Sequence, residues 1–378
     1  MPFADIAPSP LEDWLRERYF TATVDISSSG VADYSLGELR RLLDIPVEEL
    51  DAIPLRDSPS HGSPELRAAI AGRYGVPEHH VMVTHGSTEG IFLALSALLD
   101  PGDEAVVLRP VYQSLSSVAA ATGVRLRTWD LDAADGFRPD LQRLADLLTP
   151  RTRAVIVNFP HNPTGVSLNA REYGELLDLV SAHGAHLVWD AAFADLAHDA
   201  PPLPDPVTRY GRSVSFGTLS KAYGLPGMRV GWCVAPPGVL DRMVRLRDYT
   251  TLNTSPVSEY LATAAVSRAD ALIGPRLAQA GHNRQLLDTW VAARPADAAW
   301  RRPDGGVAAF PRVLGIADTT ELCTELAREH GVLVVPGACF GEPAHLRIGF
   351  GGPSGDLETG LSALATVIGR HKRREAAR

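Results

Sequence analysis

Cysteine, long hydrophobic runs and export signals are all scarce or missing in this chain of 378 residues. The three cysteines, Cys233, Cys323 and Cys339, are odd in number and lack metal-ligand spacing, which argues against a disulfide scaffold and fits a reducing cytoplasm. No apolar run is long enough to span a bilayer. The first ten residues lack the basic and apolar parts of an export signal. We therefore expect a cytoplasmic protein without a membrane partner.

Positive charge is also in short supply. The chain has 36 lysines and arginines against 45 aspartates and glutamates, so its formal net charge is -9 at pH 7. Phosphate backbones repel a chain of this charge, which makes nucleic acid a poor partner. The histidine pairs at 79–80 and at 183 and 186 have no carboxylate or cysteine at ligand spacing. We therefore predict no metal site.

Short apolar runs alternate with helical patterns over the first two thirds of the chain. Such alternation predicts an α/β fold with a mostly parallel central sheet flanked by helices. The helix after the first run is expected to be capped by Ser87, with Glu89 in its first turn. The expected strands are 81–85, 104–110, 153–160, 185–193 and 213–218.

The last third has a different pattern, with longer helical stretches and two apolar segments, 331–337 and 345–350, that predict strands. We expect a smaller α+β domain over 259–378, joined in space by an N-terminal segment, 1–44. The large domain is then 45–258. No linker rich in glycine or proline marks either boundary.

Residues suited to chemistry follow the predicted strands, at the edge where parallel sheets bind ligands. Tyr112 follows 104–110, Asn162 lies in the turn "NPTG", and Asp190 ends the segment "HLVWD". Lys221 follows 213–218, and Arg229 comes eight residues later. Together they predict one pocket at this edge of the sheet.

The predicted pocket has the parts needed to hold an aromatic aldehyde phosphate. Lys221 would condense with the aldehyde, Asp190 would hold a protonated ring nitrogen, Asn162 would bond a ring oxygen, and Tyr112 would stack on the ring. A helix N-terminus suits the phosphate because its first N–H groups are unpaired. These groups describe pyridoxal 5'-phosphate (PLP). The expected phosphate site comprises Gly86, Ser87, Thr88, Thr218 and Arg229, and Ser220 and Phe193 are further expected cofactor-binding residues.

In this order, the motifs "HGSTEG", "NPTG", "TLSK", "GLPGMRVG" and "HLRIGF" resemble the fold type I, aspartate aminotransferase-like PLP enzymes over nearly the whole chain. The resemblance implies that Arg347 of "HLRIGF" binds the substrate α-carboxylate. It also implies that Asn162 and a loop with Ser28 and Gly30 contribute to the substrate pocket. Members of this family usually work as homodimers with active sites at the subunit interface.

Two positions depart from the family pattern. Phe193 stands where many members have a tyrosine whose hydroxyl meets the PLP ring oxygen. This loss predicts a higher pKa for the nitrogen that joins Lys221 to the cofactor. The segment "LRDSPS" also lacks the aromatic residue that often reaches the neighbouring subunit's phosphate. Asp57 or Ser58 takes that place, and an acidic residue there suits a cationic substrate.

A narrower resemblance lies at the N-terminus. The segments "PLEDWLRERYF" and "DISSSGV" are similar to the capreomycidine synthases, a group of PLP enzymes in the biosynthesis of streptothricin- and viomycin-type antibiotics. The resemblance implies loss of water from (3S)-3-hydroxy-L-arginine, followed by closure of its guanidine onto the β-carbon. Asp25, Asp33 and Asp57 are candidate guanidine partners by location.

Alternatives remain open from the residues alone. An aminotransferase acting on a basic or aromatic amino acid would use the same motifs. A PLP-binding sensor domain of a transcription regulator would need a basic face, and this chain is acidic. His61 and His161 lie in loops near the expected pocket, and their roles stay open.

Overall fold

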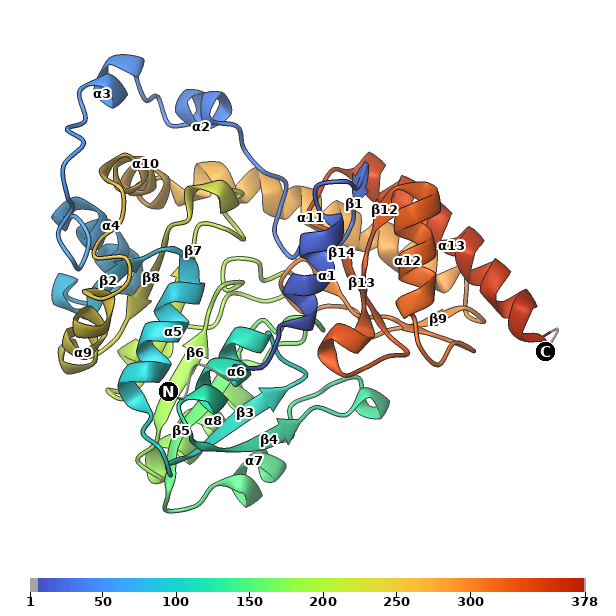
Figure 1. Ribbon diagram of the computed structural model, residues 1–378, viewed down its shortest axis with the longest axis horizontal. Helices are drawn as coiled ribbons and strands as arrows, with labels where there is room; N and C mark the ends of the chain where they lie inside the picture. The colour runs from blue at the N-terminus through green and yellow to red at the C-terminus, as the bar shows by residue number, and fades with distance from the viewer. Residues whose placement is uncertain (1–5, 377–378) are drawn as a thin grey trace.

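The structure, a computed structural model, describes residues 6–376. The predicted ranges 1–44 and 259–378 therefore include a few residues, 1–5 and 377–378, that lie outside the described part. Figure 1 shows two parts of unequal size: one around the large sheet, and one formed mainly by the C-terminal third of the chain.

A seven-stranded sheet is the centre of the larger part. Its strand order is β2-β8-β7-β6-β5-β3-β4, and only β8 runs antiparallel to its neighbours. This confirms the predicted mostly parallel sheet, although β4 and β8 were not expected. The strands are β2 (Val81–Thr84), β3 (Glu104–Arg109), β4 (Arg125–Asp130), β5 (Thr152–Asn158), β6 (His186–Asp190), β7 (Ser213–Thr218) and β8 (Gly231–Val234).

Helices cover both faces of this sheet, so alternate residues of its central strands enter two different cores. Val155 and Leu187 pack into one core, whereas Ile156 and Val188 pack into the other. The helices are α1 (Pro10–Arg18), α2 (Leu36–Leu42), α3 (Val47–Asp51), α4 (Pro64–Tyr74), α5 (Gly86–Leu98), α6 (Gln113–Ala121), α7 (Leu141–Leu147), α8 (Ala170–Ala182), α9 (Pro237–Arg247), α10 (Pro256–Ser267), α11 (Ala269–Ala292), α12 (Thr320–His330) and α13 (Ser354–Ala376).

Short strands organise the smaller part. The predicted strand 331–337 is wrong as a single element, because it divides into β12, which pairs with β1, and β13, which pairs with β14. The predicted strand 345–350 contains β14. The short strands are β1 (Val24–Asp25), β9 (Ala298–Ala299), β10 (Ala308–Ala309), β11 (Arg312–Val313), β12 (Val332–Leu333), β13 (Val335–Pro336) and β14 (Leu346–Gly349).

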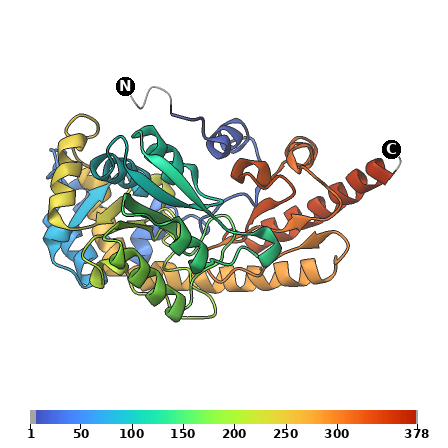
Figure 2. The ribbon, with the colours of Figure 1, turned by 90° about the horizontal axis from the view of Figure 1, so that it is seen from below.

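The N-terminal segment joins the smaller part through β1 and α1. Figure 1 and Figure 2 both place α1 against that part, and the Trp14 indole donates to the Val334 carbonyl at 2.9 Å. The segment with α2 and α3 then runs toward α10, where Arg268 pairs with Asp44 at 3.1 Å. These contacts support, as a proposal, the division into 1–44, 45–258 and 259–378.

Candidate active site

A cavity of about 530 Å³ lies where the ends of β2, β5, β6 and β7 face the smaller part. The structure brings most of the predicted site residues together there, although their roles remain predictions. The predicted residues that line it are Gly86, Ser87, Thr88, Tyr112, Asn162, Asp190, Phe193, Thr218, Ser220, Lys221, Arg229 and Arg347.

Lys221 follows β7 and projects its amine into this cavity. Nζ donates to the Ser29 hydroxyl at 2.8 Å and lies 5.6 Å from the centre of the Phe193 ring. Burial lowers the pKa of Lys221 to about 8, and the positive charge of Arg347 acts in the same direction. A substantial fraction of this lysine is therefore the neutral amine near pH 8, the form that acts as nucleophile or base.

Asp190 ends β6, beside the end of β5, and is buried. Its carboxylate accepts the backbone N–H of Ala192 at 3.1 Å and has no ion pair with any described residue. Burial raises the pKa of Asp190 to about 6. A protonated ring nitrogen beside it would supply the missing positive partner.

Asn158 was not predicted as a site residue, yet it links two that were. Its side chain donates to the Asp190 carbonyl at 2.9 Å and accepts the Asn162 N–H at 2.8 Å. It is buried at the end of β5, and a polar residue closing the apolar run "AVIVN" was the available signal. Asn158 thus fixes the turn that presents Asn162 to the cavity.

The N-terminus of α5 forms one end of the cavity. The expected cap is wrong: α5 begins at Gly86, so Ser87 lies inside the first turn. The N-cap is His85, whose side chain makes no capping bond, and the Glu89 carboxylate accepts the His85 N–H at 2.6 Å. The first turn therefore presents its N–H groups to the cavity, as an anion site requires.

Arg229 lies over this helix end. Gly86 has a φ of +69°, and a Cβ there would lie 2.9 Å from an Arg229 nitrogen, so glycine leaves room for the guanidinium. Gly231 is constrained in the same way, because its Cβ would lie 2.6 Å from the Ser87 nitrogen. The Thr218 hydroxyl donates to that of Ser220 at 3.0 Å beside them.

Arg347, on β14, is a buried cation with neutral partners only. It donates to the Asn162 side chain at 3.1 Å and to the Ser27 carbonyl at 2.8 Å, and its Nε has no hydrogen-bond partner. Burial lowers the pKa of Arg347 to about 10. No carboxylate of the described residues pairs with it, so a substrate carboxylate would satisfy a charge that the fold leaves uncompensated.

Two predicted pocket residues, Ser28 and Gly30, do not line the cavity. The Ser28 hydroxyl accepts the Gly30 N–H at 3.1 Å and shapes the loop, while Gly30 packs against the Ser220 carbonyl. Ser29, between them, is the residue that lines the cavity and binds Lys221. The predicted loop therefore reaches the cavity through Ser29, which was not predicted, and its role in substrate binding stays a prediction.

The loop histidines also stay outside the lining. His161 is buried and bonds the Pro110 carbonyl and the Thr164 hydroxyl, each at 2.7 Å. Burial lowers the pKa of His161 to about 4, so it is neutral and supports the loop. The backbone carbonyl of His61 accepts the Val83 N–H, and its ring does not line the cavity.

The three candidate guanidine partners, Asp25, Asp33 and Asp57, lie outside the lining. Asp25 instead accepts the N–H of Ser27 at 2.7 Å and its hydroxyl at 2.6 Å. The N-terminal segment forms one wall of the cavity. Its lining residues are Ile6, Ala7, Ser9, Leu11, Glu12 and Leu15.

These residues fit PLP. The uncapped end of α5 with Arg229 suits a phosphate, Lys221 suits an aldehyde, and Asp190 suits a basic ring nitrogen. Tyr112 and Phe193 supply aromatic walls. Within residues 6–376, no cluster of three or more His, Cys, Asp or Glu side chains could hold a metal ion. No helix in that range is long and apolar enough to cross a membrane.

The fold and cavity define a PLP-dependent enzyme of the aminotransferase-like class. Residues 56–364 match the model "Aminotransferase class I and II", and the chain belongs to that family. PLP is accordingly its cofactor.

Individual proteins in the family differ in how similar they are to this chain. The chain is 53% identical to capreomycidine synthase of Streptomyces vinaceus over 97% of this chain and 95% of the relative. It superimposes on the solved PLP-dependent cyclase OrfR with a TM-score of 0.92 and 44% identity, covering 97% of this chain and 98% of that one. The arginine–pyruvate transaminase AruH of Pseudomonas aeruginosa is 31% identical over 76% of both chains.

Proposed function

We propose that this chain is a PLP-dependent cyclase that converts (3S)-3-hydroxy-L-arginine to capreomycidine. The observation that carries the proposal is the 53% identity to a capreomycidine synthase along 97% of the chain. The likeness to a solved PLP-dependent cyclase supports the same reaction class. We also propose that it serves the biosynthesis of a streptothricin- or viomycin-type antibiotic.

The cavity residues divide the work of binding. Arg347 binds the substrate α-carboxylate through paired N–H donors, because it is buried without an anionic partner. Asn162, whose side-chain oxygen accepts a hydrogen bond from Arg347, orients that carboxylate and the cofactor ring. The end of α5, Thr218, Ser220 and Arg229 hold the cofactor phosphate, and Tyr112 covers the ring.

Lys221 moves the proton in this mechanism. PLP, when bound, supplies the electron sink that stabilises negative charge at the substrate α-carbon. The Lys221 amine takes the α-proton and later returns it to the same carbon. Its pKa of about 8 makes this exchange practical near neutral pH. Asp190 maintains the positive charge of the ring nitrogen throughout, and Ser29 positions Nζ between transfers.

The net reaction balances without an oxidant or a second substrate. The bond between the β-carbon and its hydroxyl breaks, and that oxygen leaves as water. A bond from a guanidine nitrogen to the β-carbon forms, and this nitrogen gives up one proton. The product is therefore the substrate minus one water, with a six-membered ring that contains the guanidine.

An aminotransferase acting on a basic amino acid is the second candidate, favoured by the 31% identity to an arginine–pyruvate transaminase. Mass spectrometry after mixing the holoenzyme with 3-hydroxyarginine, without a keto acid, separates the two. The cyclase gives a product lighter by one water, with a cyclic guanidine by NMR. Product formation only after addition of a keto acid acceptor would overturn the cyclase proposal.

A cytoplasmic homodimer is the form we propose for this enzyme. Large apolar side chains stand exposed on the single chain, including Phe20 at 89%, Leu55 at 84% and Tyr249 at 91%. A second copy would bury such residues. The three cysteines are unpaired and buried, which suits a reducing compartment. Light scattering of the purified protein would test the dimer.

A further inference from the structure

The cavity contains one carboxylate to which the mechanism gives no role. Among the described lining residues, only Asp190 and Glu12 are acidic. Asp190 is buried at the end of β6, and the mechanism assigns it to the ring nitrogen of the cofactor. Glu12 lies on α1, at the more exposed wall formed by the N-terminal segment.

Glu12 is held in place by the helix that carries it. Leu11 and Trp14 are buried on either side of it, and the Trp14 indole donates to the Val334 carbonyl at 2.9 Å. The Cys339 thiol donates to the Pro10 carbonyl at 3.5 Å. The helix therefore docks on the same part of the molecule that supplies Arg347, and Figure 2 shows α1 beside that part.

The contacts of Glu12 differ from those of the other acids on α1. Asp13 pairs with Arg16 and Glu17 pairs with Arg18, both at 2.6 Å. Glu12 forms no ion pair with any residue between 6 and 376, and it accepts only the Tyr112 hydroxyl at 3.3 Å. Burial lowers the pKa of Lys221 and of Arg347, and the negative charge of Glu12 partly opposes that lowering at both, so the carboxylate lies close enough to act on these two cations.

Resting on the proposed function, we propose that Glu12 binds the guanidinium of the substrate and selects for arginine-type side chains. Arg347 would hold the α-carboxylate and Lys221 would face the α-carbon. The side chain of the substrate then extends toward a wall on which Glu12 is the only anion among the described lining residues. A carboxylate can accept two parallel N–H bonds from a guanidinium, which also sets the plane of the guanidine.

Equilibrium binding tests this without turnover. The probes are L-arginine, which has no hydroxyl to lose, and L-citrulline, its neutral urea counterpart, titrated into holoenzyme and followed by cofactor absorbance. We expect the wild type to bind arginine at least about 10-fold tighter than citrulline, the gain of one charge-assisted pair. Glu12→Gln should reduce that ratio to near one by weakening arginine alone.

Two further variants make the result interpretable. Asp13→Asn, on the same helix but outside the lining, should leave both affinities unchanged. Glu12→Asp should retain part of the arginine preference, and circular dichroism should confirm the fold of each variant. With 3-hydroxyarginine, Glu12→Gln should raise KM more than it lowers kcat, since this contact exists before the reaction.

The outcomes separate this inference from the proposed function. A Glu12→Gln enzyme that still prefers arginine overturns the role of Glu12, as does a wild type that binds both probes equally. A wild type that prefers arginine through Glu12 but forms no cyclic product overturns the cyclase and leaves the guanidinium site standing.

Discussion

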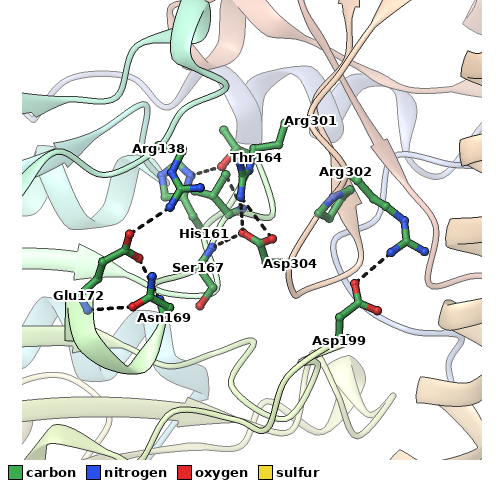
Figure 3. A network of polar contacts seen from close by, with 12 residues as sticks. Arg138, His161, Thr164, Ser167, Asn169, Glu172, Asp199, Arg301, Arg302 and Asp304 are labelled. Atoms are coloured by element: carbon green, nitrogen blue, oxygen red, sulfur yellow. Dashed lines mark hydrogen bonds and ion pairs between the residues drawn. The ribbon is translucent and has the colours of Figure 1, made fainter. Parts of the chain in front are cut away.

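Two polar regions of this molecule differ in whether their charged side chains form ion pairs. In the junction network, which ties the segment 300–305 to the sheet part, each guanidinium has a carboxylate: Arg138 with Glu172 at 3.0 Å, Arg302 with Asp199 at 2.9 Å, and Arg301 with Asp304 at 3.1 Å (Figure 3). In the cavity, Lys221, Arg347 and Asp190 contact only neutral groups.

The two regions differ in which groups neutralise their charged side chains. The ion pairs of the junction are complete without a ligand, and the pair between Arg302 and Asp199 joins the segment 300–305 to the sheet part. The cavity charges lie within one pocket without pairing, and burial shifts their pKa values toward the neutral forms. Such groups cost free energy in the empty protein, and a bound cofactor and substrate supply the missing charges. In this molecule, therefore, buried charges without an ion pair lie in the candidate active site, whereas charges in ion pairs lie at structural contacts.

The largest contrast is expected between two lysines. Lys221→Ala should lower kcat/KM by at least about 10³-fold, because it removes the proton carrier, and should abolish covalent attachment of PLP. Lys372→Ala removes a lysine that pairs with Asp297 at 2.8 Å and is not part of the cavity lining, and it should leave activity unchanged. Steady-state assays and the absorbance of the holoenzyme measure both. If Lys221→Ala still bound PLP covalently, Lys221 would not be the residue that attaches the cofactor.

Substituting one arginine in each region tests the comparison directly, with Arg347 in the cavity and Arg284 at the junction. Arg347→Met should lower kcat/KM by about 100- to 1,000-fold through a raised KM, since two charge-assisted bonds to the α-carboxylate are lost. The apoenzyme should lose little stability, because an uncompensated buried charge is removed. Urea unfolding of the apoenzyme and steady-state kinetics are the measurements.

Arg284→Met is the structural counterpart of that substitution. Arg284 is buried, pairs with Asp199 at 2.6 Å and donates to the Pro303 carbonyl at 2.9 Å. Its loss should lower the free energy of unfolding by about 1 to 3 kcal/mol with KM unchanged. If the Arg347 variant were the less stable and the Arg284 variant the less active, the distinction between the two regions would be wrong.

Opposite pH dependences should separate two aspartates. Burial raises the pKa of Asp190 to about 6, so the buried carboxyl is neutral at low pH and costs no stability there. As pH rises through 6 the carboxyl ionises, and the free energy of unfolding falls. Apoenzyme with Asp190→Asn should match the wild type near pH 4 and exceed it above pH 6 by up to about 3 kcal/mol. Urea unfolding at several pH values measures this difference.

Asp199 provides the reverse case. Its bond to Arg284 holds the pKa of its carboxyl below the usual range. Its stabilising contribution is therefore present at neutral pH and is lost only as pH falls through that lowered value. Asp199→Asn should be less stable than the wild type at pH 7 and approach it in acid. Parallel curves for the two aspartate variants would contradict the assignment of Asp190.

Much of the site could be predicted because it depends on strand ends. Asn162, Asp190 and Lys221 each follow an apolar run, and parallel strands bring such positions to one edge. Ser29, Asn158 and Glu12 were missed. Ser29 is 192 positions from Lys221, and Glu12 is 100 positions from Tyr112, so only the folded chain brings them together.

The missed strands have local causes. β4, at the sheet edge, has only two apolar residues among charged and polar ones and is mostly not buried, so it lacked the continuous apolar run of its neighbours. β8 follows the loop "GLPGMR" and begins with glycine, which is rare inside strands. The segment 331–337 looked like one strand because its apolar run is continuous, although it pairs with two different neighbours.

The smallest expected effect concerns Phe193, the apolar wall beside Lys221. The ring centre lies 5.6 Å from Nζ and offers no hydroxyl to the cofactor ring oxygen. Phe193→Tyr should add one hydrogen bond that stabilises the negative oxygen, and so lower the pKa of the nitrogen joining Lys221 to PLP by about one unit. A spectroscopic pH titration of the holoenzyme measures this pKa. Phe92→Tyr, on α5 outside the cavity lining, is the control and should leave it unchanged. A wild-type linkage already deprotonated at neutral pH would contradict the expectation, because Asn162 alone would then supply what the family's tyrosine provides.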